Sequence, residues 1–184
     1  MSKRIALLSA AAFGALAMTA TIIAPVSAQE KTVMVGGAAM FPSKNIIQNA
    51  VHSKDHTTLV AAVKAAGLVD TLEGTGPFTV FAPTNAAFGK LPAGTVDTLV
   101  KPENKATLTK ILTYHVVPGR LEASDLSDGK KLKTVEGEEL TVRKADGKVM
   151  IVDAKGGSAT VTIPNVNQSN GVIHVVDTVL MPAS

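Results

Sequence analysis

The chain has 184 residues, no cysteine and a formal net charge of +3. The lack of cysteine excludes a disulfide scaffold, thiol chemistry and cysteine-based metal sites. Lys3 and Arg4 lie at the very start, so residues 29–184 carry only 3 − 2 = +1, and a domain this close to neutral is not expected to bind nucleic acid.

The first 28 residues have the pattern of a secretory signal peptide. A short basic start precedes the apolar run Ile5–Ala24, and Pro25 is followed by the small residues of Val26–Ala28. This pattern predicts cleavage after Ala28. The length of the run also raises the alternative of a retained membrane anchor, but its alanines and threonines and the small-residue site favour cleavage. We therefore expect an extracellular or periplasmic protein without a stable membrane span after leader removal.

Residues 29–42 are rich in Gly and Ala, and we expect them to form a flexible N-terminal segment or a short edge segment. Residues 43–184 are predicted to form one domain. A domain of this size buries about 70% of its unfolded surface in one core, so it needs no disulfide or metal to be stable.

Helical patterns fill the first half of this domain. Ser43 is expected to cap a helix that runs through about Val51. A second helix is predicted from Thr57, and Gly67 suits the left-handed position after its end. Two later helices follow from apolar spacing, one with Val96 and Leu99 and one that begins at Pro102 and carries Leu108, Ile111 and Leu112.

A short strand interrupts these helices at Phe78–Phe81. Pro83 ends the strand, and Thr84 can cap the helical turn that follows. We expect Phe78, Phe81 and Phe88 to be mostly buried, which leaves few aromatic side chains for stacking on sugars or on nucleic-acid bases.

Strand patterns fill the second half. Tyr114–Val117 is predicted as a strand, and Asp146–Gly147 is predicted as the turn of a hairpin between Leu140–Arg143 and Val149–Val152. Another strand follows at 159–163. The last one, Val172–Met181, is apolar on both faces and should lie inside the sheet. Helices first and strands last predict an α+β fold with a largely antiparallel sheet.

Three segments occur in one order: Phe78–Phe88, Tyr114–Gly119 and Asn170–Pro182. Together they resemble the two homology boxes and the Tyr-His segment of the fasciclin domain family, and the similarity extends over about residues 45–182. The closest likeness is to small bacterial secreted members with one domain after a leader. The family's Asp-Ile pair is not retained, because Pro164–Val166 stands near its place, so the integrin contact of animal members is not expected.

The resemblance implies a β-wedge flanked by helices packed N-terminally, and a role in cell adhesion or surface and matrix association. The implied partner is a cell-surface or matrix protein or a polysaccharide, with no nucleic acid involved. We expect a monomer that needs no cofactor and is not an enzyme, because the sequence holds neither a Gly-x-Ser-x-Gly elbow nor a phosphate-binding loop.

Six polar residues of the matched segments are candidates for binding, although a structural role is favoured: Thr84, Asn85, Tyr114, His115, Asn170 and His174. On the structural interpretation each histidine lies on a strand and is hydrogen-bonded in the core, with Thr84, Asn85 or Asn170 as its expected partner. The alternative is an extracytoplasmic protein that binds a small ligand or a metal.

Two further groups of residues have some features of a binding site. His52 and His56 have the four-residue spacing of metal ligands on a helix, but a predicted helix break at residues 53–55 removes the meaning of that spacing. The sequence therefore favours no metal site. The lysines at 130, 131 and 133 lie beside acidic residues at 136, 138 and 139, and this group is interpreted as a solvated hairpin surface.

Overall fold

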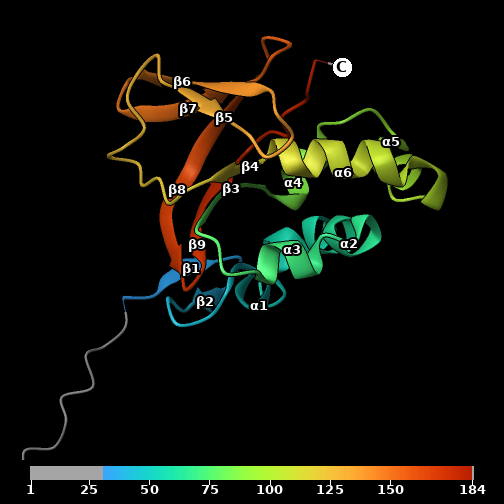
Figure 1. Cartoon of the computed structure of the whole chain (residues 1–184), viewed down its shortest axis with the longest axis horizontal. Helices are drawn as coiled ribbons and strands as arrows, with labels where there is room; N and C mark the ends of the chain where they lie inside the picture. Colours follow the sequence, from blue (N-terminus) through green and yellow to red (C-terminus); the bar gives the residue numbers. More distant parts are fainter. Residues whose placement is uncertain (1–30, 184) are drawn as a thin grey trace, which may run out of the picture.

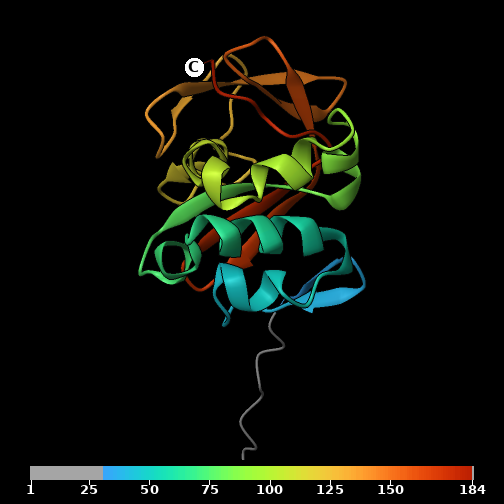
Figure 2. The ribbon, with the colours of Figure 1, turned by 90° about the vertical axis from the view of Figure 1, so that its right-hand side faces the viewer.

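The computed structural model describes residues 31–183, so the predicted signal peptide at 1–28 lies outside the described residues. Helices and a strongly curved sheet form two adjoining parts (Figure 1). Seen after a quarter turn, the long helices lie in front of the strands that join the two parts (Figure 2).

A small antiparallel hairpin begins the described chain. It consists of β1 (Val33–Val35) and β2 (Ala38–Met40), joined through Gly36 and Gly37 with positive φ angles of 58° and 76°. Val35 and Met40 are buried in the helical core. This part of the segment expected to be flexible is therefore packed structure, because its alternate residues are apolar and face the core.

Helix α1 (Ile46–Ala50) starts later than expected. Asn45 caps it instead of Ser43, since the Asn45 side chain accepts a hydrogen bond from the Gln48 backbone while the Gln48 side chain accepts one from the Asn45 backbone. Such a reciprocal box satisfies two free backbone N–H groups, whereas a single hydroxyl satisfies one.

The second helix, the strand and the Thr84 cap agree with their predictions, and two short helical segments beside them were not predicted. A short 3-10 turn, η1 (Lys54–His56), leads into α2 (Thr57–Ala66), and Gly67 has the expected left-handed conformation with φ 73°. After α3 (Val69–Glu73) comes β3 (Phe78–Pro83), and the Thr84 hydroxyl caps α4 (Asn85–Gly89) by accepting a hydrogen bond from Ala87 at 3.2 Å.

The prediction of a strand at Tyr114–Val117 is wrong in its first half. After α5 (Thr95–Leu99) and η2 (Pro102–Asn104), helix α6 (Lys105–Tyr114) includes the tyrosine, His115 is its C-cap, and β4 is only Val116–Pro118. The reason is that the helical spacing of buried residues continues past Leu112, and His115 stands one turn after Ile111 on the same face.

The larger sheet has seven strands in the order β4-β3-β9-β8-β7-β6-β5. All neighbours are antiparallel except β3 and β9, which run parallel. The later strands are β5 (Lys131–Lys133), β6 (Glu139–Ala145), β7 (Lys148–Val152), β8 (Ser158–Gln168) and β9 (Gly171–Val176). The hairpin at Asp146–Gly147 and the interior position of the last strand are confirmed, but that strand ends five residues earlier than predicted.

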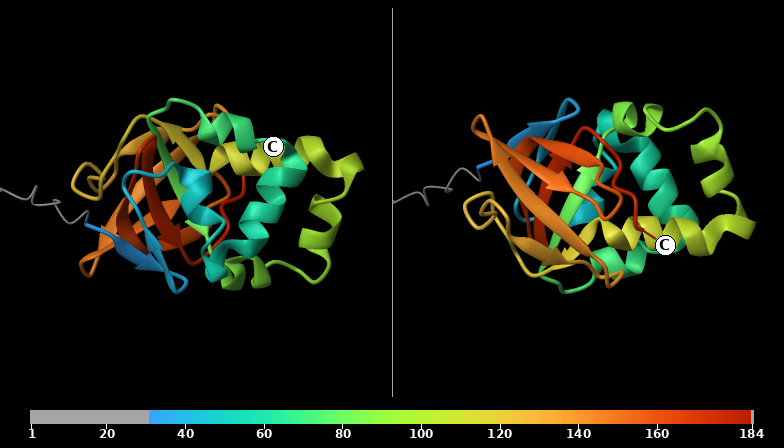
Figure 3. Two further views of the ribbon diagram at one scale, coloured as in Figure 1. Left: turned by 90° about the horizontal axis from the view of Figure 1, so that it is seen from below. Right: turned by 90° about the horizontal axis from the view of Figure 1, so that it is seen from above.

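The sheet curls until its two edges meet. The Val135 N–H just after β5 donates to the Val116 carbonyl of β4 at 2.8 Å, so the strands enclose a barrel-like interior that Figure 3 shows from below and above. This contact leaves neither edge of the sheet fully open for pairing with another chain.

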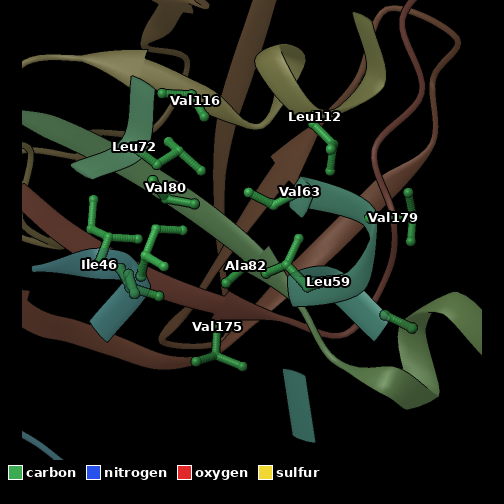
Figure 4. Packing of buried hydrophobic residues seen from close by; sticks show 14 of the residues in the cluster. Ile46, Leu59, Val63, Leu72, Val80, Ala82, Leu112, Val116, Val175 and Val179 are labelled. Atoms are coloured by element: carbon green, nitrogen blue, oxygen red, sulfur yellow. The ribbon is translucent and has the colours of Figure 1, made fainter. Parts of the chain in front are cut away.

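Strand β9 separates two hydrophobic cores. Ile173 and Val175 face the helical core, which includes residues of α1, α2, α3 and α6 (Figure 4). His174 lies on the other face, and Val176 belongs to the barrel core there together with Phe81, Tyr114, Leu140 and Ile151. Both faces of β9 are therefore covered, as its unbroken apolar pattern indicated.

Candidate functional site

The two matched histidines meet at Phe81, on the strand that both cores share. His174 pairs with Phe81 in the β3–β9 register, and their rings stack with centroids 5.7 Å apart. The Phe81 N–H also donates to the His115 carbonyl at 2.9 Å. The fold thus brings His115 and His174 to one place, the junction between α6, β3 and β9.

Both ring nitrogens of His115 have backbone partners. Nδ1–H donates to the Ile111 carbonyl at 2.8 Å, and Nε2 accepts from the Leu180 N–H at 2.9 Å. The partners fix the neutral tautomer, because a carbonyl only accepts and an N–H only donates. Burial lowers the pKa of His115 to about 4, so the ring is neutral at pH 7 and joins the end of α6 to the C-terminal segment.

His174 makes an equivalent joint with the opposite tautomer. Nε2–H donates to the Leu121 carbonyl at 2.7 Å, and Nδ1 accepts from the Asn165 N–H at 3.3 Å. Burial lowers the pKa of this ring as well. The expected partners Thr84, Asn85 and Asn170 are wrong for both histidines, since backbone groups take their place, one of them distant in the sequence for each ring.

Asn170 and Asn85 are connectors outside this junction. Asn170 accepts from the Ile46 N–H at 3.1 Å and donates to the carbonyls of Leu72 at 2.7 Å and Gly74 at 2.9 Å, which ties the β8–β9 turn to α1 and α3.

Asn85 accepts from the Thr58 N–H and donates to the Lys54 carbonyl and the Thr57 hydroxyl. It holds the start of α4 against the start of α2. Each side-chain amide therefore uses its oxygen and both N–H groups within the fold.

Tyr114 is fully buried in the barrel core, and its hydroxyl makes two hydrogen bonds. The hydroxyl donates to the Glu139 carbonyl at 3.3 Å and accepts from the Ala154 N–H at 2.9 Å. Burial raises the pKa of the phenol. Five of the six candidate residues thus cross-link segments and Thr84 caps α4, so the six do not form one convergent polar cluster.

His56 differs from the other buried histidines. Its Nδ1 contacts the Ser53 hydroxyl at 2.9 Å, but its Nε2 is buried without a hydrogen-bond partner. Burial lowers the pKa of His56, against smaller opposing effects of the Ala82 carbonyl and Asp55. The ring borders an apolar cavity of about 40 Å³ between α1, α2 and β3, which has room for about one water molecule.

The predicted break between His52 and His56 is present. His52 is exposed beyond α1 and contacts the Gln48 carbonyl, whereas His56 points into the core. Across residues 31–183, no group of three or more His, Cys, Asp or Glu side chains could hold a metal ion. Within the same range, no helix is long and apolar enough to cross a membrane.

Two further polar joints were not predicted from the sequence. Asp153 receives hydrogen bonds from the N–H groups of Lys155, Gly157 and Met181. Asn165, with φ 56°, accepts from the Ala123 N–H at 2.7 Å. Asn tolerates this left-handed conformation better than most residues. The asparagine at position 165 was therefore the only local sign in the sequence of a turn-like backbone there.

This architecture defines an α+β protein with a curved β-wedge, helices on one side, and polar side chains that lock the strands to the helices. A family model described as "Fasciclin domain" matches residues 54–182, which is more than half of the chain. The chain belongs to the fasciclin domain family.

Relatives and a solved structure agree with this membership. The chain is 48% identical to Protein sll1483 of Synechocystis, over 91% of this chain and 90% of that one. It is 39% identical to Immunogenic protein MPB70 of Mycobacterium bovis, over 72% and 66% of the two chains. With Cell surface glycolipoprotein MPB83 of the same species it shares 46% identity over 62% of this chain and 48% of that one.

The fold is similar to a FAS1 domain pair from the insect cell adhesion molecule fasciclin I. The TM-score is 0.68 with 21% identity, and the likeness covers 77% of this chain and 52% of that one. At this identity the likeness concerns the fold alone.

Proposed function

We propose that the protein acts outside the cytoplasm as an interaction module, in cell adhesion or in association with a surface or matrix. Its contacts would be with a protein or a polysaccharide. Family membership supports this proposal, as do the relatives named as an immunogenic protein and a cell surface glycolipoprotein. The predicted signal peptide is consistent with it.

One observation carries the proposal: the polar residues of the matched segments are used inside the fold. His115, His174 and Asn170 have all their side-chain hydrogen-bonding atoms engaged with backbone groups of the fold. A catalytic or ligand site needs polar groups that are free to meet the substrate. We therefore assign these residues to the architecture and place the contact surface elsewhere on the domain.

Capture from the native cell envelope tests the proposal. Residues 29–184 are immobilised and exposed to envelope and exopolysaccharide fractions of the source organism, with a heat-unfolded sample as the control. The proposal predicts retention of a specific protein or polysaccharide by the folded form. Equal retention by both forms, together with unchanged attachment of cells that lack the gene, would contradict it.

The alternative is a protein that binds a small ligand, and one observation favours it. The unpaired Nε2 of His56 lies at the wall of an apolar cavity. At about 40 Å³ that cavity limits an occupant to one or two heavy atoms. Native mass spectrometry of the untagged protein would detect a retained molecule or metal, and its absence would remove this alternative.

A further inference from the structure

One side of the curved sheet carries an array of cations. In the register of β5, β6, β7 and β8, one set of alternating side chains fills the barrel core and the other set points away from it. We name the outward set the outer sheet face. Its members are Lys131, Lys133, Glu139, Thr141, Arg143, Ala145, Lys148, Met150, Val152, Ser158 and Thr160.

Positive charge is concentrated on this face. It holds four cations and one carboxylate, or 4 − 1 = +3, whereas residues 29–184 together carry +1. The remaining surface therefore has a net charge of 1 − 3 = −2. All four cations are exposed. Of these four, only Lys131 has an ion pair with a described residue, to Glu139 at 3.3 Å.

Of the three acidic residues beside the lysines, Glu139 pairs with Lys131, and the other two have contacts outside the lysine group. Glu136 pairs with Lys110 at 3.6 Å, and Glu138 accepts a hydrogen bond from the Ala183 N–H at 2.8 Å. Lys133 is exposed on β5, as expected for a solvated hairpin surface, and it has no ion pair among the described residues. Lys133, Arg143 and Lys148 are left to meet an external anion.

The layout of the face suits an extended polymer. In the register, Lys131, Arg143 and Lys148 lie on a diagonal across β5, β6 and β7, each one strand and two residues from the next, or about 8 Å apart. Lys133 lies further along β5, opposite Glu139. Thr141 lies opposite Lys131 and Met150 lies opposite Arg143, and the half-buried Val152 and the hydroxyl of Thr160 flank them on β7 and β8. Such a surface offers charge, hydrogen bonds and apolar contacts to successive units of a chain.

The chemistry favours a carboxylate-bearing sugar chain over neutral sugars or nucleic acid. Strands β5 to β8 contain no aromatic residue, and aromatic stacking is what single-stranded bases use most for sequence-tolerant binding. The sugar's carboxylates would meet the cations, and its hydroxyl and C–H groups would meet the threonines and the apolar side chains.

We propose that the outer sheet face binds an anionic polysaccharide with carboxylates along its chain. This inference rests on the proposed function and names the partner class and the binding surface. Lys133, Arg143 and Lys148 make the charge contacts, and Thr141 and Thr160 add hydrogen bonds.

Alginate, a polymer of uronic acids, is the probe, and neutral dextran is the control polymer. Binding of residues 29–184, which include every described helix and strand, is measured by affinity electrophoresis at low and at physiological ionic strength. The triple variant Lys133→Gln, Arg143→Gln, Lys148→Gln removes three charges from the face. The matched variant Lys64→Gln, Lys101→Gln, Lys105→Gln removes three exposed charges from the helical part.

We expect alginate to bind at least tenfold more weakly to the outer-face variant than to the parent, and less than twofold more weakly to the matched variant. Binding to the parent should also weaken at the higher ionic strength, because salt screens exposed charges. Dextran should not bind. Both variants should keep the melting temperature of the parent, since exposed charges contribute little to stability.

Equal weakening by the two triple variants would overturn the proposal, because net charge alone would then explain binding. No alginate binding by the parent chain would overturn it too. If envelope capture succeeds in that case, the proposed function stands and only the polysaccharide assignment fails.

Discussion

The barrel half and the helical half of the domain bury histidines in different ways. In the barrel half and at its border, His174 and His115 have partners for both ring nitrogens. In the helical half, His56 has one unpaired nitrogen beside a cavity with apolar walls. A buried polar group without a partner loses its hydration without recovering a hydrogen bond.

The difference indicates which half tolerates change. In the barrel half and at its border, two of the histidine hydrogen bonds join segments 53 and 65 residues apart in the sequence. The helical half is also cross-linked, by Asn170 to α1 and α3, but around α2 and α6 it relies on apolar packing and leaves a small volume unfilled. We therefore expect that replacing a histidine with two hydrogen-bond partners lowers the free energy of unfolding more than replacing a residue around the cavity.

The largest effect is expected for His174→Ala. The change removes the ring stacked on Phe81 and leaves the Leu121 carbonyl and the Asn165 N–H without their partner. Truncation of a large core side chain costs about 3–5 kcal/mol, so the free energy of unfolding measured with urea should fall by about that amount. His56→Ala should cost at least about 1 kcal/mol less, because the lost ring makes fewer hydrogen bonds. Equal losses would remove the distinction between the halves.

Acid should destabilise the protein through His115. Its pKa is about 4 in the fold and about 6.5 when unfolded, so the unfolded chain binds the extra proton first as the pH falls from 7. Stability from this group is complete above pH 6.5 and is lost toward pH 4, by about 3 kcal/mol. The free energy of unfolding, measured with urea at several pH values from 7 to 4, should therefore fall more steeply with decreasing pH in the parent than in His115→Gln, because glutamine does not titrate. Parallel pH profiles would contradict this explanation.

Asn170→Ala should have an intermediate effect. It removes three hydrogen bonds to backbone groups of α1 and α3 and the loop after them, and a loss of about 2–3 kcal/mol follows from their burial. Asn85→Ala is the comparison, because its donors are more exposed and water can replace them, so about 1 kcal/mol is expected. Thermal unfolding of both variants measures the two losses of stability. A larger loss for Asn85→Ala than for Asn170→Ala would contradict this prediction.

The smallest effect should be a gain. Val63 lines the cavity beside His56, and Val63→Ile adds one methyl group where space is available. Filling a cavity commonly adds about 0.5–2 kcal/mol, and the low end is expected because the volume is small. Calorimetry should show a slightly higher melting temperature. A decrease would mean that the added methyl group does not fit the cavity.

Predictions from local rules succeeded where the physical cause is local. Gly67 and Thr84 end and begin helices through contacts within a few residues, and the apolar pattern of β9 revealed a strand with two covered faces. The two possible caps, Ser43 and Asn45, are only two residues apart, and the Gln48 side chain decides that Asn45 caps the helix. The strand predicted at Tyr114 failed because helical spacing continued into residues with strand preference.

The candidate site was harder to predict because its partners are remote. The sequence identified His115 and His174 as buried and hydrogen-bonded, but nothing local to either one points to Leu180, Leu121 or Asn165. The outward side of β5 to β8 was also missed, because its charges come together only when the register of four strands is known.

The central claim is that the residues of the matched segments hold the fold and that partners bind elsewhere. The most direct test compares His115→Ala with the parent chain at a temperature where both are fully folded, by measuring the melting temperature and the affinity for the captured envelope partner on the same samples. We predict a melting temperature lower by several degrees and an unchanged affinity. A variant that keeps its melting temperature but loses the partner would contradict the claim.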